Sequence, residues 1–248
     1  MNSFAATGFE FRHRSWFIFA IFFFAYELNY FFPDNACVVL VGHFVPKGSP
    51  FFPIWLHALF GGAALVALTG AAVRTWGTAY LGAGIMTDRG LHSERLTADG
   101  PFRFVRNPLY VGLVLTAAGL SGTIDIPGGV LLVVLMALFV LRLALREESG
   151  LAAAQGEAYE AYRRRVPRFL PSPRPRLPSS GALPQWRQAL VAEFMAWSFA
   201  VALVVLAVSL NGRLYWETFA VGLCAGTIVY SLQRPRTRAD ASAGSCEG

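Results

Sequence analysis

Apolar residues in this chain are gathered into long blocks that polar, basic segments separate. A helix of about 20 apolar residues is long enough to cross a bilayer, so blocks of that length indicate membrane spans. Six blocks reach or approach it: Trp16 to Phe32, Ile54 to Val73, Leu109 to Thr123, Gly128 to Leu145, Leu190 to Leu210 and Leu214 to Leu232. The pattern predicts an all-α, multi-pass transmembrane helical bundle with about six spans.

Three of these blocks need separate interpretation. Only Ile124 to Pro127 lies between the third and fourth blocks, which are short, so together they predict one tight helical hairpin. The first block follows a basic stretch, Arg12 to Arg14, as the apolar part of a signal peptide does. However, bulky residues at Tyr30 to Pro33 stand where a cleavage site would need small ones. We therefore interpret the first block as a transmembrane helix.

Composition and charge agree with a membrane protein. Hydrophobic residues make up 55% of the chain and charged residues 15%, against about 25% charged in soluble domains. With the amino terminus inside, 19 of the 21 Lys and Arg residues fall in inside segments, and Lys47 and Arg213 fall outside. This asymmetry follows the positive-inside rule. It accounts for the net charge of +6, so we expect both termini in the cytoplasm and no nucleic-acid partner.

Cysteine and histidine give no sign of a metal site. Cys37, Cys224 and Cys246 share no metal-ligand or C-x-x-C spacing, and the four histidines are scattered. The sequence therefore predicts neither a bound metal nor a redox pair. The Ala- and Arg-rich composition favours a bacterial inner membrane.

Two inside segments, Arg74 to Pro108 and Arg146 to Trp186, are too long and too patterned to be simple connectors. The first predicts a surface loop or hairpin that closes on turn signals at Asp99 to Pro101. The second predicts an amphipathic helix and then a proline-rich linker, with an SH3-type ligand as the alternative. We divide the chain into amino-terminal transmembrane helices (1–73), a motif-bearing core (74–172), a proline-rich strap (173–188), a carboxy-terminal transmembrane hairpin (189–233) and a disordered tail (234–248). Gly222 and Gly226 would give the carboxy-terminal hairpin a small-residue contact face.

The most specific pattern is the block from Gly100 to Gly112, Gly-Pro-Phe-Arg-Phe-Val-Arg-Asn-Pro-Leu-Tyr-Val-Gly. Pro108 suits the first position of a helix, so we expect the third span to begin there. The free amides of that helix end would then lie beside Arg103 and Arg106, which makes the end suitable for a carboxylate. The alternative is that these arginines only anchor a helix end to lipid headgroups.

Two further patterns carry candidate chemistry. Glu147 and Glu148 stand at the inside end of the fourth block, where the helix dipole opposes them, so stability does not explain them. Arg146 is one candidate partner, and a ligand hydroxyl or ammonium group is another. Tyr159 and Tyr162 share a helix face, where they would bind a substrate or stack on a purine or, alternatively, form an interfacial aromatic belt.

Together these patterns resemble the isoprenylcysteine carboxyl methyltransferase and phospholipid methyltransferase group of membrane enzymes. That group has a G-P-[YF]-R-x-[VI]-R-[HN]-P-x-Y-x-G block, then an E-E pair, then a G-x-x-Y-x-x-Y-x-x-x-[VI]-P-R segment, in the order found here. The resemblance covers about Arg74 to Pro171. Weaker support comes from Arg74 to Trp76, Leu81-Gly82, the G-x-G at Gly82 and Gly84, and His92 to Leu96. Asn107 replaces a histidine that is usual in the isoprenylcysteine enzymes.

The resemblance implies a methyltransferase that binds S-adenosylmethionine (SAM) in a pocket on the inside face. The acceptor would be a lipophilic or small molecule, a carboxylate, amine or thiol, that enters from the bilayer. It implies catalytic roles for Arg103, Arg106 and Arg168, and cofactor contacts for Gly100, Pro101, Phe102, Val105, Asn107, Pro108, Tyr110, Gly112, Glu147, Glu148, Tyr159 and Tyr162. In-line methyl transfer needs mainly alignment and electrostatic support.

Two other functions remain open at this point. A sterol-type NADPH-dependent membrane reductase also carries an H-P-x-Y-x-G-like block and a nucleotide pocket at the inside face. A non-enzymatic transporter or scaffold would use the arginines only to set topology. The acid pair and the segment from Gly156 to Arg168 favour methyl transfer.

Overall fold

Every regular element in the described part of the chain is helical. The computed structural model describes residues 4–28, 31, 34–81 and 98–233. The elements are α1 (Gly8–Arg12), α2 (Arg14–Glu27), α3 (Ala36–Phe44), α4 (Phe51–Leu81), η2 (Gly100–Arg103), α6 (Pro108–Leu120), η3 (Ser121–Thr123), α7 (Ile126–Gln155), α8 (Glu157–Arg165), α9 (Trp186–Ala192), α10 (Phe194–Ser209) and α11 (Gly212–Gln233). The all-α prediction is confirmed for these ranges.

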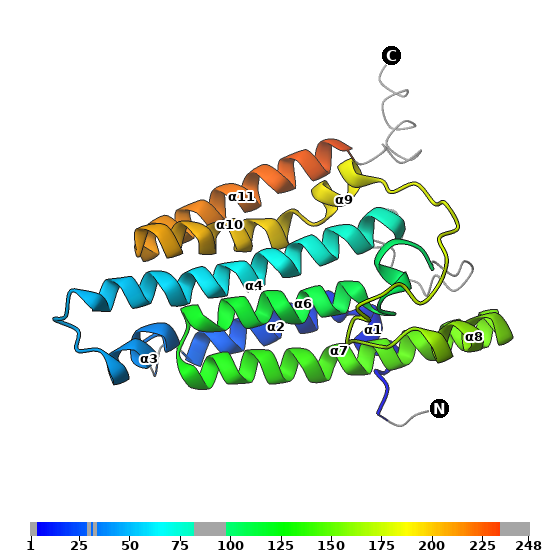
Figure 1. Ribbon diagram of the computed structural model, residues 1–248, viewed down its shortest axis with the longest axis horizontal. Helices are drawn as coiled ribbons and strands as arrows, with labels where there is room; N and C mark the ends of the chain where they lie inside the picture. The colour runs from blue at the N-terminus through cyan, green and yellow to red at the C-terminus, as the bar shows by residue number, and fades with distance from the viewer. Residues whose placement is uncertain (1–3, 29–30, 32–33, 82–97, 234–248) are drawn as a thin grey trace, which may run out of the picture.

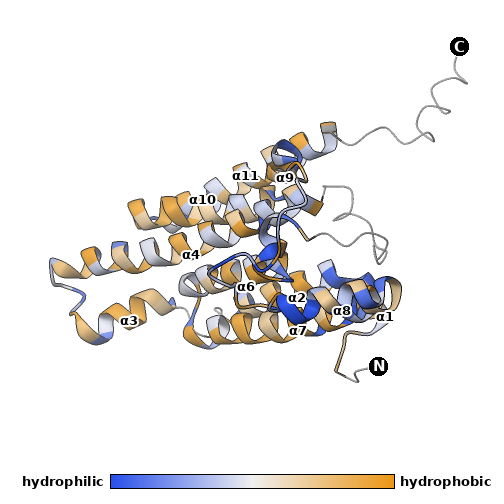
Figure 2. Cartoon of the chain, turned by 45° about the vertical axis from the view of Figure 1, so that its right-hand side comes forward, coloured by the Kyte–Doolittle hydropathy of each residue, from blue (hydrophilic) through white to orange (hydrophobic). Residues whose placement is uncertain are grey.

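The long helices run side by side with α4 at the centre (Figure 1). α6 packs on one side of α4 and α10 on the other, and α11 packs against α10. Hydrophobic residues follow the lengths of these helices, and hydrophilic residues gather at the end that carries α8 (Figure 2). The bundle therefore has apolar flanks and one polar end.

The helices that qualify as membrane spans are fewer than the blocks in the sequence. α4 and α7 are each long and apolar enough to cross a membrane, and α9 with α10, bent by 70°, would make a third span. All six predicted blocks coincide with a helix, namely α2, α4, α6, α7, α10 and α11. The structure thus supports two or three spans, and the six-span bundle stays a prediction.

Small residues bring α6 directly against α4. A Cβ atom at Gly112 would lie 2.6 Å from the Gly70 carbonyl oxygen, and one at Gly70 would lie 2.7 Å from the Gly112 carbonyl oxygen. Such close approach is typical of helix pairs in membranes. The predicted small-residue face of α11 is also in contact, because a Cβ at Gly222 would meet Ser198 and one at Gly226 would meet Phe194.

The predicted hairpin is present and its turn is well defined. α6 begins at Pro108 as expected, since a missing N–H costs nothing at the first helical position. The chain then turns through η3, and α7 follows with Asp125 as its N-cap, whose side chain accepts a hydrogen bond from the Gly128 amide at 2.7 Å. The hairpin places the motif block beside the acid pair of α7.

Two expectations about element ends are wrong. The segment from Arg74 to Leu81 is the last part of α4 rather than a loop, because Thr75, Gly77, Thr78 and Ala79 are buried against other helices. α7 continues to Gln155, so Glu147 and Glu148 lie about two turns before its end and the dipole argument does not apply to them. α9 begins at Trp186, inside the predicted strap of residues 173–188, and the domain bounds stay a prediction. Predictions for Gly82, Gly84, His92 to Leu96 and residues 234–248 lie outside the described ranges.

Candidate active site

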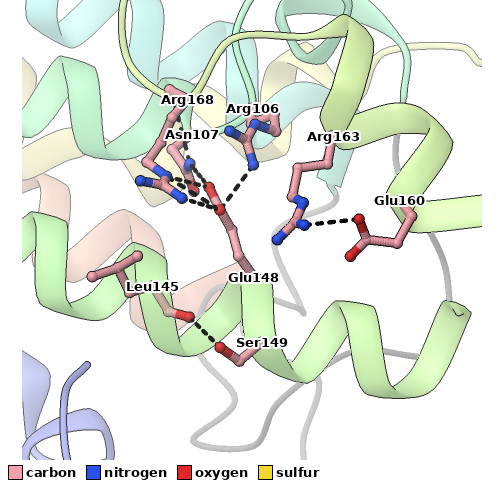
Figure 3. Close-up of polar contacts among 8 residues, drawn as sticks. All are labelled: Arg106, Asn107, Leu145, Glu148, Ser149, Glu160, Arg163 and Arg168. Carbon is pink, nitrogen blue, oxygen red and sulfur yellow. Dashed lines mark hydrogen bonds and ion pairs between the residues drawn. The ribbon is translucent and has the colours of Figure 1, made fainter. Parts of the chain in front are cut away.

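Glu148 of α7 is the centre of a buried polar cluster (Figure 3). The Nε of Arg168 donates to Oε1 of Glu148 at 3.0 Å and its Nη2 donates to Oε2 at 2.9 Å. Arg106 Nη1 donates to Oε2 at 2.8 Å, and Asn107 Nδ2 donates to Oε1 at 3.0 Å. Asn107 and Arg106 come from the motif block, and Arg168 comes from the segment after α8. One carboxylate therefore joins all three sequence patterns.

The charges of this cluster do not balance. Two guanidinium groups face the single carboxylate of Glu148, which is 5% exposed. The hydrogen bonds between Arg168 and Glu148 raise the pKa of Arg168 above the ordinary value of an arginine. The Nε of Arg106 is buried and has no hydrogen-bond partner among the described residues. Because buried polar groups are normally paired, this spare donor and the excess positive charge suit an added anionic group.

Glu147 has a different environment from its neighbour. Tyr110 of α6 donates its hydroxyl to Oε1 of Glu147 at 2.8 Å, and the glutamate is half-buried. Successive residues of a helix point about 100° apart, so the two acids contact different groups. Arg146, one partner considered from the sequence, instead donates to the Ala6 carbonyl at 3.1 Å and lies over the Phe11 ring.

Tyr159 and Tyr162 attach α8 to the motif block. They are 1% and 6% exposed, and the Tyr162 hydroxyl donates to the Phe102 carbonyl at 2.9 Å. Burial raises the pKa of Tyr159 to about 12 and also raises that of Tyr162, so both phenols stay protonated at neutral pH. Side chains buried within the protein do not form an aromatic belt in the lipid.

The remaining motif residues shape the chain around the cluster. Pro101, Phe102 and Val105 are buried. Gly100 has a φ of +57°, which favours glycine, and a Cβ there would clash with the Tyr80 ring. Gly112 contacts α4, so its observed role is helix packing, and its predicted contact with the cofactor stays a prediction.

An extended segment, residues 166–185, runs beside the motif block. Backbone hydrogen bonds join Arg106 N to Pro167 O at 2.8 Å, Ser172 N to Phe104 O at 3.0 Å and Arg176 N to Arg103 O at 2.8 Å. Arg103 also uses its side chain here, because Nε donates to the Leu177 carbonyl at 2.7 Å. Arg103 thus holds the extended segment, and the structure does not place it in the Glu148 cluster.

Asp99 fastens the far part of this segment, a contact that the sequence patterns did not indicate. Its carboxylate is 3% exposed and accepts hydrogen bonds from the Ser179 hydroxyl at 3.0 Å, from the Ser180 hydroxyl, from the Ser180 amide at 3.0 Å and from the Ala182 amide at 3.1 Å. These bonds, led by that of the Ser180 hydroxyl, lower the pKa of Asp99 to about 2.

We predict that Asp99→Asn lowers the midpoint temperature of thermal unfolding at pH 7. The rate at which protease cleaves residues 166–185 should rise by roughly tenfold, because a charged hydrogen-bond acceptor is lost. The folded pKa lies below the unfolded value of about 3.9. The contribution of Asp99 is therefore complete above pH 4 and is lost as the pH falls towards 2. Midpoints measured from pH 7 to pH 2 should converge for parent and variant, and a constant difference would contradict this assignment. Arg174→Lys, at an exposed position of the same segment, is the control.

Comparison with known proteins finds a family match in the segment that holds most of α4 together with α6 and α7. Residues 57–157 match the sequence model of the phospholipid methyltransferase family. This segment is similar to that family. No curated protein and no solved structure matches the chain. The match confirms the resemblance to membrane methyltransferases, and it includes the motif block, Glu147 and Glu148 but ends before Arg168.

Proposed function

We propose that the chain is a SAM-dependent membrane methyltransferase whose cofactor site is built around Glu148. The observation that carries the proposal is the meeting of Arg106, Asn107 and Arg168 at this one carboxylate. The match of residues 57–157 to the phospholipid methyltransferase family supports the class of reaction.

The residues around Glu148 fit the groups of SAM. When bound, SAM supplies a methyl group on a sulfonium, together with a carboxylate, an amino group and ribose hydroxyls. Arg106 offers its spare Nε to the carboxylate, and Arg168 adds positive charge. Among the described residues, the Tyr110 hydroxyl donates to Oε1 of Glu147 at 2.8 Å, and we assign the second oxygen of Glu147 to a hydroxyl or ammonium group of SAM.

Glu148 has a different function in this proposal from Glu147. Its oxygens already accept bonds from Arg168, Arg106 and Asn107. We assign it to holding the two arginines in place, as preorganised electrostatic sites require. Arg103 orders the chain beside them by binding residue 177.

The acceptor would reach this site from the lipid. Ile126, Val130, Val134 and Leu138 are exposed at four-residue intervals along α7, so they form one apolar stripe on the face that membrane lipid would cover. A lipophilic or small acceptor with a carboxylate, amine or thiol fits such an entry. In this proposal, the cofactor site is a pocket on the inside face of the membrane.

Methyl transfer from SAM tests the function directly. Purified protein in nanodiscs that contain phosphatidylethanolamine would receive SAM with a radiolabelled methyl group, with and without an added prenylated cysteine carboxylate. We expect the label in the extracted lipid or in the added acceptor, and neither with Glu148→Gln. Oxidation of NADPH with no transfer of label would favour the sterol-type reductase instead.

The topology expected from the charges is a separate prediction. In Figure 1, the α10–α11 turn and the link between α3 and α4 lie at one end of the bundle, and α1 and α8 lie at the other. We expect Ser49→Cys and Asn211→Cys to react with an impermeant maleimide from the outside, and Arg174→Cys only from the cytoplasm. The parent for these variants has its native cysteines replaced by serine. Labelling of all three positions from the same side would contradict the topology.

A further inference from the structure

A second buried ion pair joins the carboxy-terminal helices to α4. Glu193 stands at the 70° bend between α9 and α10 and is 2% exposed. Arg74 binds it with a fork, Nε to Oε2 at 2.6 Å and Nη2 to Oε1 at 3.2 Å. The Thr78 hydroxyl, one turn further along α4, donates to Oε1 at 2.7 Å. Glu193 lies beyond the residues that match the family.

The same guanidinium reaches the start of the motif helix. Arg74 Nη1 donates to the Leu109 carbonyl in the first turn of α6 at 3.3 Å. Gly112 leaves space for the stem of Arg74, because a Cβ at Gly112 would lie 2.5 Å from its Cγ. The residue after Leu109 is Tyr110, whose hydroxyl donates to Glu147. A continuous series of contacts therefore leads from Glu193 to Glu147.

Adhesion between helices does not require this pair. Apolar residues of similar volume usually stabilise a buried position at least as well as an ion pair does. A forked pair, by contrast, fixes the plane of the guanidinium and so fixes where the third nitrogen of Arg74 points. That nitrogen faces Leu109.

We propose that Glu193 is a positioning residue for the site around Glu147 and Glu148. It orients Arg74, and Arg74 holds the first turn of α6, which places Tyr110 against Glu147. This role rests on the proposed function, and it makes the carboxy-terminal helices α9 and α10 part of the support of the site.

Exchange of the two charges separates positioning from adhesion. In the double variant Arg74→Glu with Glu193→Arg, an ion pair can form again between α4 and the bend. A glutamate at position 74 cannot donate to the Leu109 carbonyl, however. We therefore expect the double variant to regain thermal stability relative to the single variants, while amide hydrogen exchange in residues 109–116 stays faster than in the parent.

Glu193→Gln serves as the second variant, because it keeps the shape of the side chain. We expect faster exchange in residues 109–116 and a SAM affinity lower by roughly tenfold or more, the usual effect of losing a charged hydrogen bond. Trp197→Phe is the matched control. It removes the bond from Trp197 Nε1 to Thr75 Oγ1, 2.9 Å, between α4 and α10, and should leave both quantities within about twofold of the parent.

The measurement of amide hydrogen exchange tests the proposal without any bound ligand. Parent-like exchange in residues 109–116 in either Glu193 variant, or an equal increase in Trp197→Phe, would overturn the positioning role. Failure of the parent protein to bind SAM would refute the proposed function alone, since the exchange comparison uses no ligand.

Discussion

Replacement of Glu148 with glutamine should lower the affinity for SAM by roughly a hundredfold or more while the protein stays folded and inserted. The carboxylate is the counter-ion of two arginines whose side chains are 10% and 34% exposed. Removing one partner of a buried ion pair costs about 3 to 5 kcal/mol, which exceeds the energy of a hundredfold change in binding. The freed guanidinium groups would turn towards other acceptors, and the site would lose its arrangement. Equilibrium dialysis with labelled SAM measures the effect.

A matched control lies one helix away. Glu160 of α8 pairs with Arg163 at 2.8 Å, and their side chains are 32% and 47% exposed (Figure 3). Exposed pairs contribute little, so Glu160→Gln should bind SAM like the parent. If Glu148→Gln also bound SAM within twofold of the parent, the assignment of this cluster would be wrong.

Replacement of Arg168 with lysine should reduce SAM affinity and methyl transfer by roughly ten- to a hundredfold. Arg168 binds both oxygens of Glu148, through Nε and Nη2. Lysine keeps the charge but cannot reproduce the planar fork, and loss of a charged hydrogen bond costs about 1.5 to 3 kcal/mol.

Arg106→Lys should also reduce both quantities, because lysine lacks the Nε that we assign to the SAM carboxylate, although Arg106 makes only one bond to Glu148, through Nη1 at 2.8 Å. Arg174→Lys, an exposed position in the extended segment, should have no effect. Kinetics of all three variants at matched expression provide the measurement. Activity within twofold of the parent for both Arg106→Lys and Arg168→Lys would return these arginines to anchoring the protein at the headgroups.

The sequence predicted the positions of the helices better than their ends. Long apolar blocks identify helices because each block must be buried or covered by lipid. The end of α7 depends on other features. Residues 149–155 continue the helix through Leu151 and three alanines, which have high helix propensity, and Gly156, with a φ of +53°, follows its last residue.

For the site, the sequence identified the residue types but not their pairing. The sequence predicted a ligand carboxylate beside Arg103 and Arg106, which stays a prediction, and it did not indicate the fork that Arg168 makes with Glu148. Arg74 and Glu193 are 119 residues apart in the chain, so no local spacing indicates their contact. The available signal was Glu193, the single acid within the apolar block from Leu190 to Leu210, because membrane proteins rarely tolerate such an acid without a partner.

Titration of the purified parent protein with SAM, and separately with NADPH, tests the central claim most directly. The account predicts saturable binding of SAM at one site per chain and no binding of NADPH. Binding of NADPH in place of SAM, or no binding of SAM to protein that is folded and inserted, would contradict it.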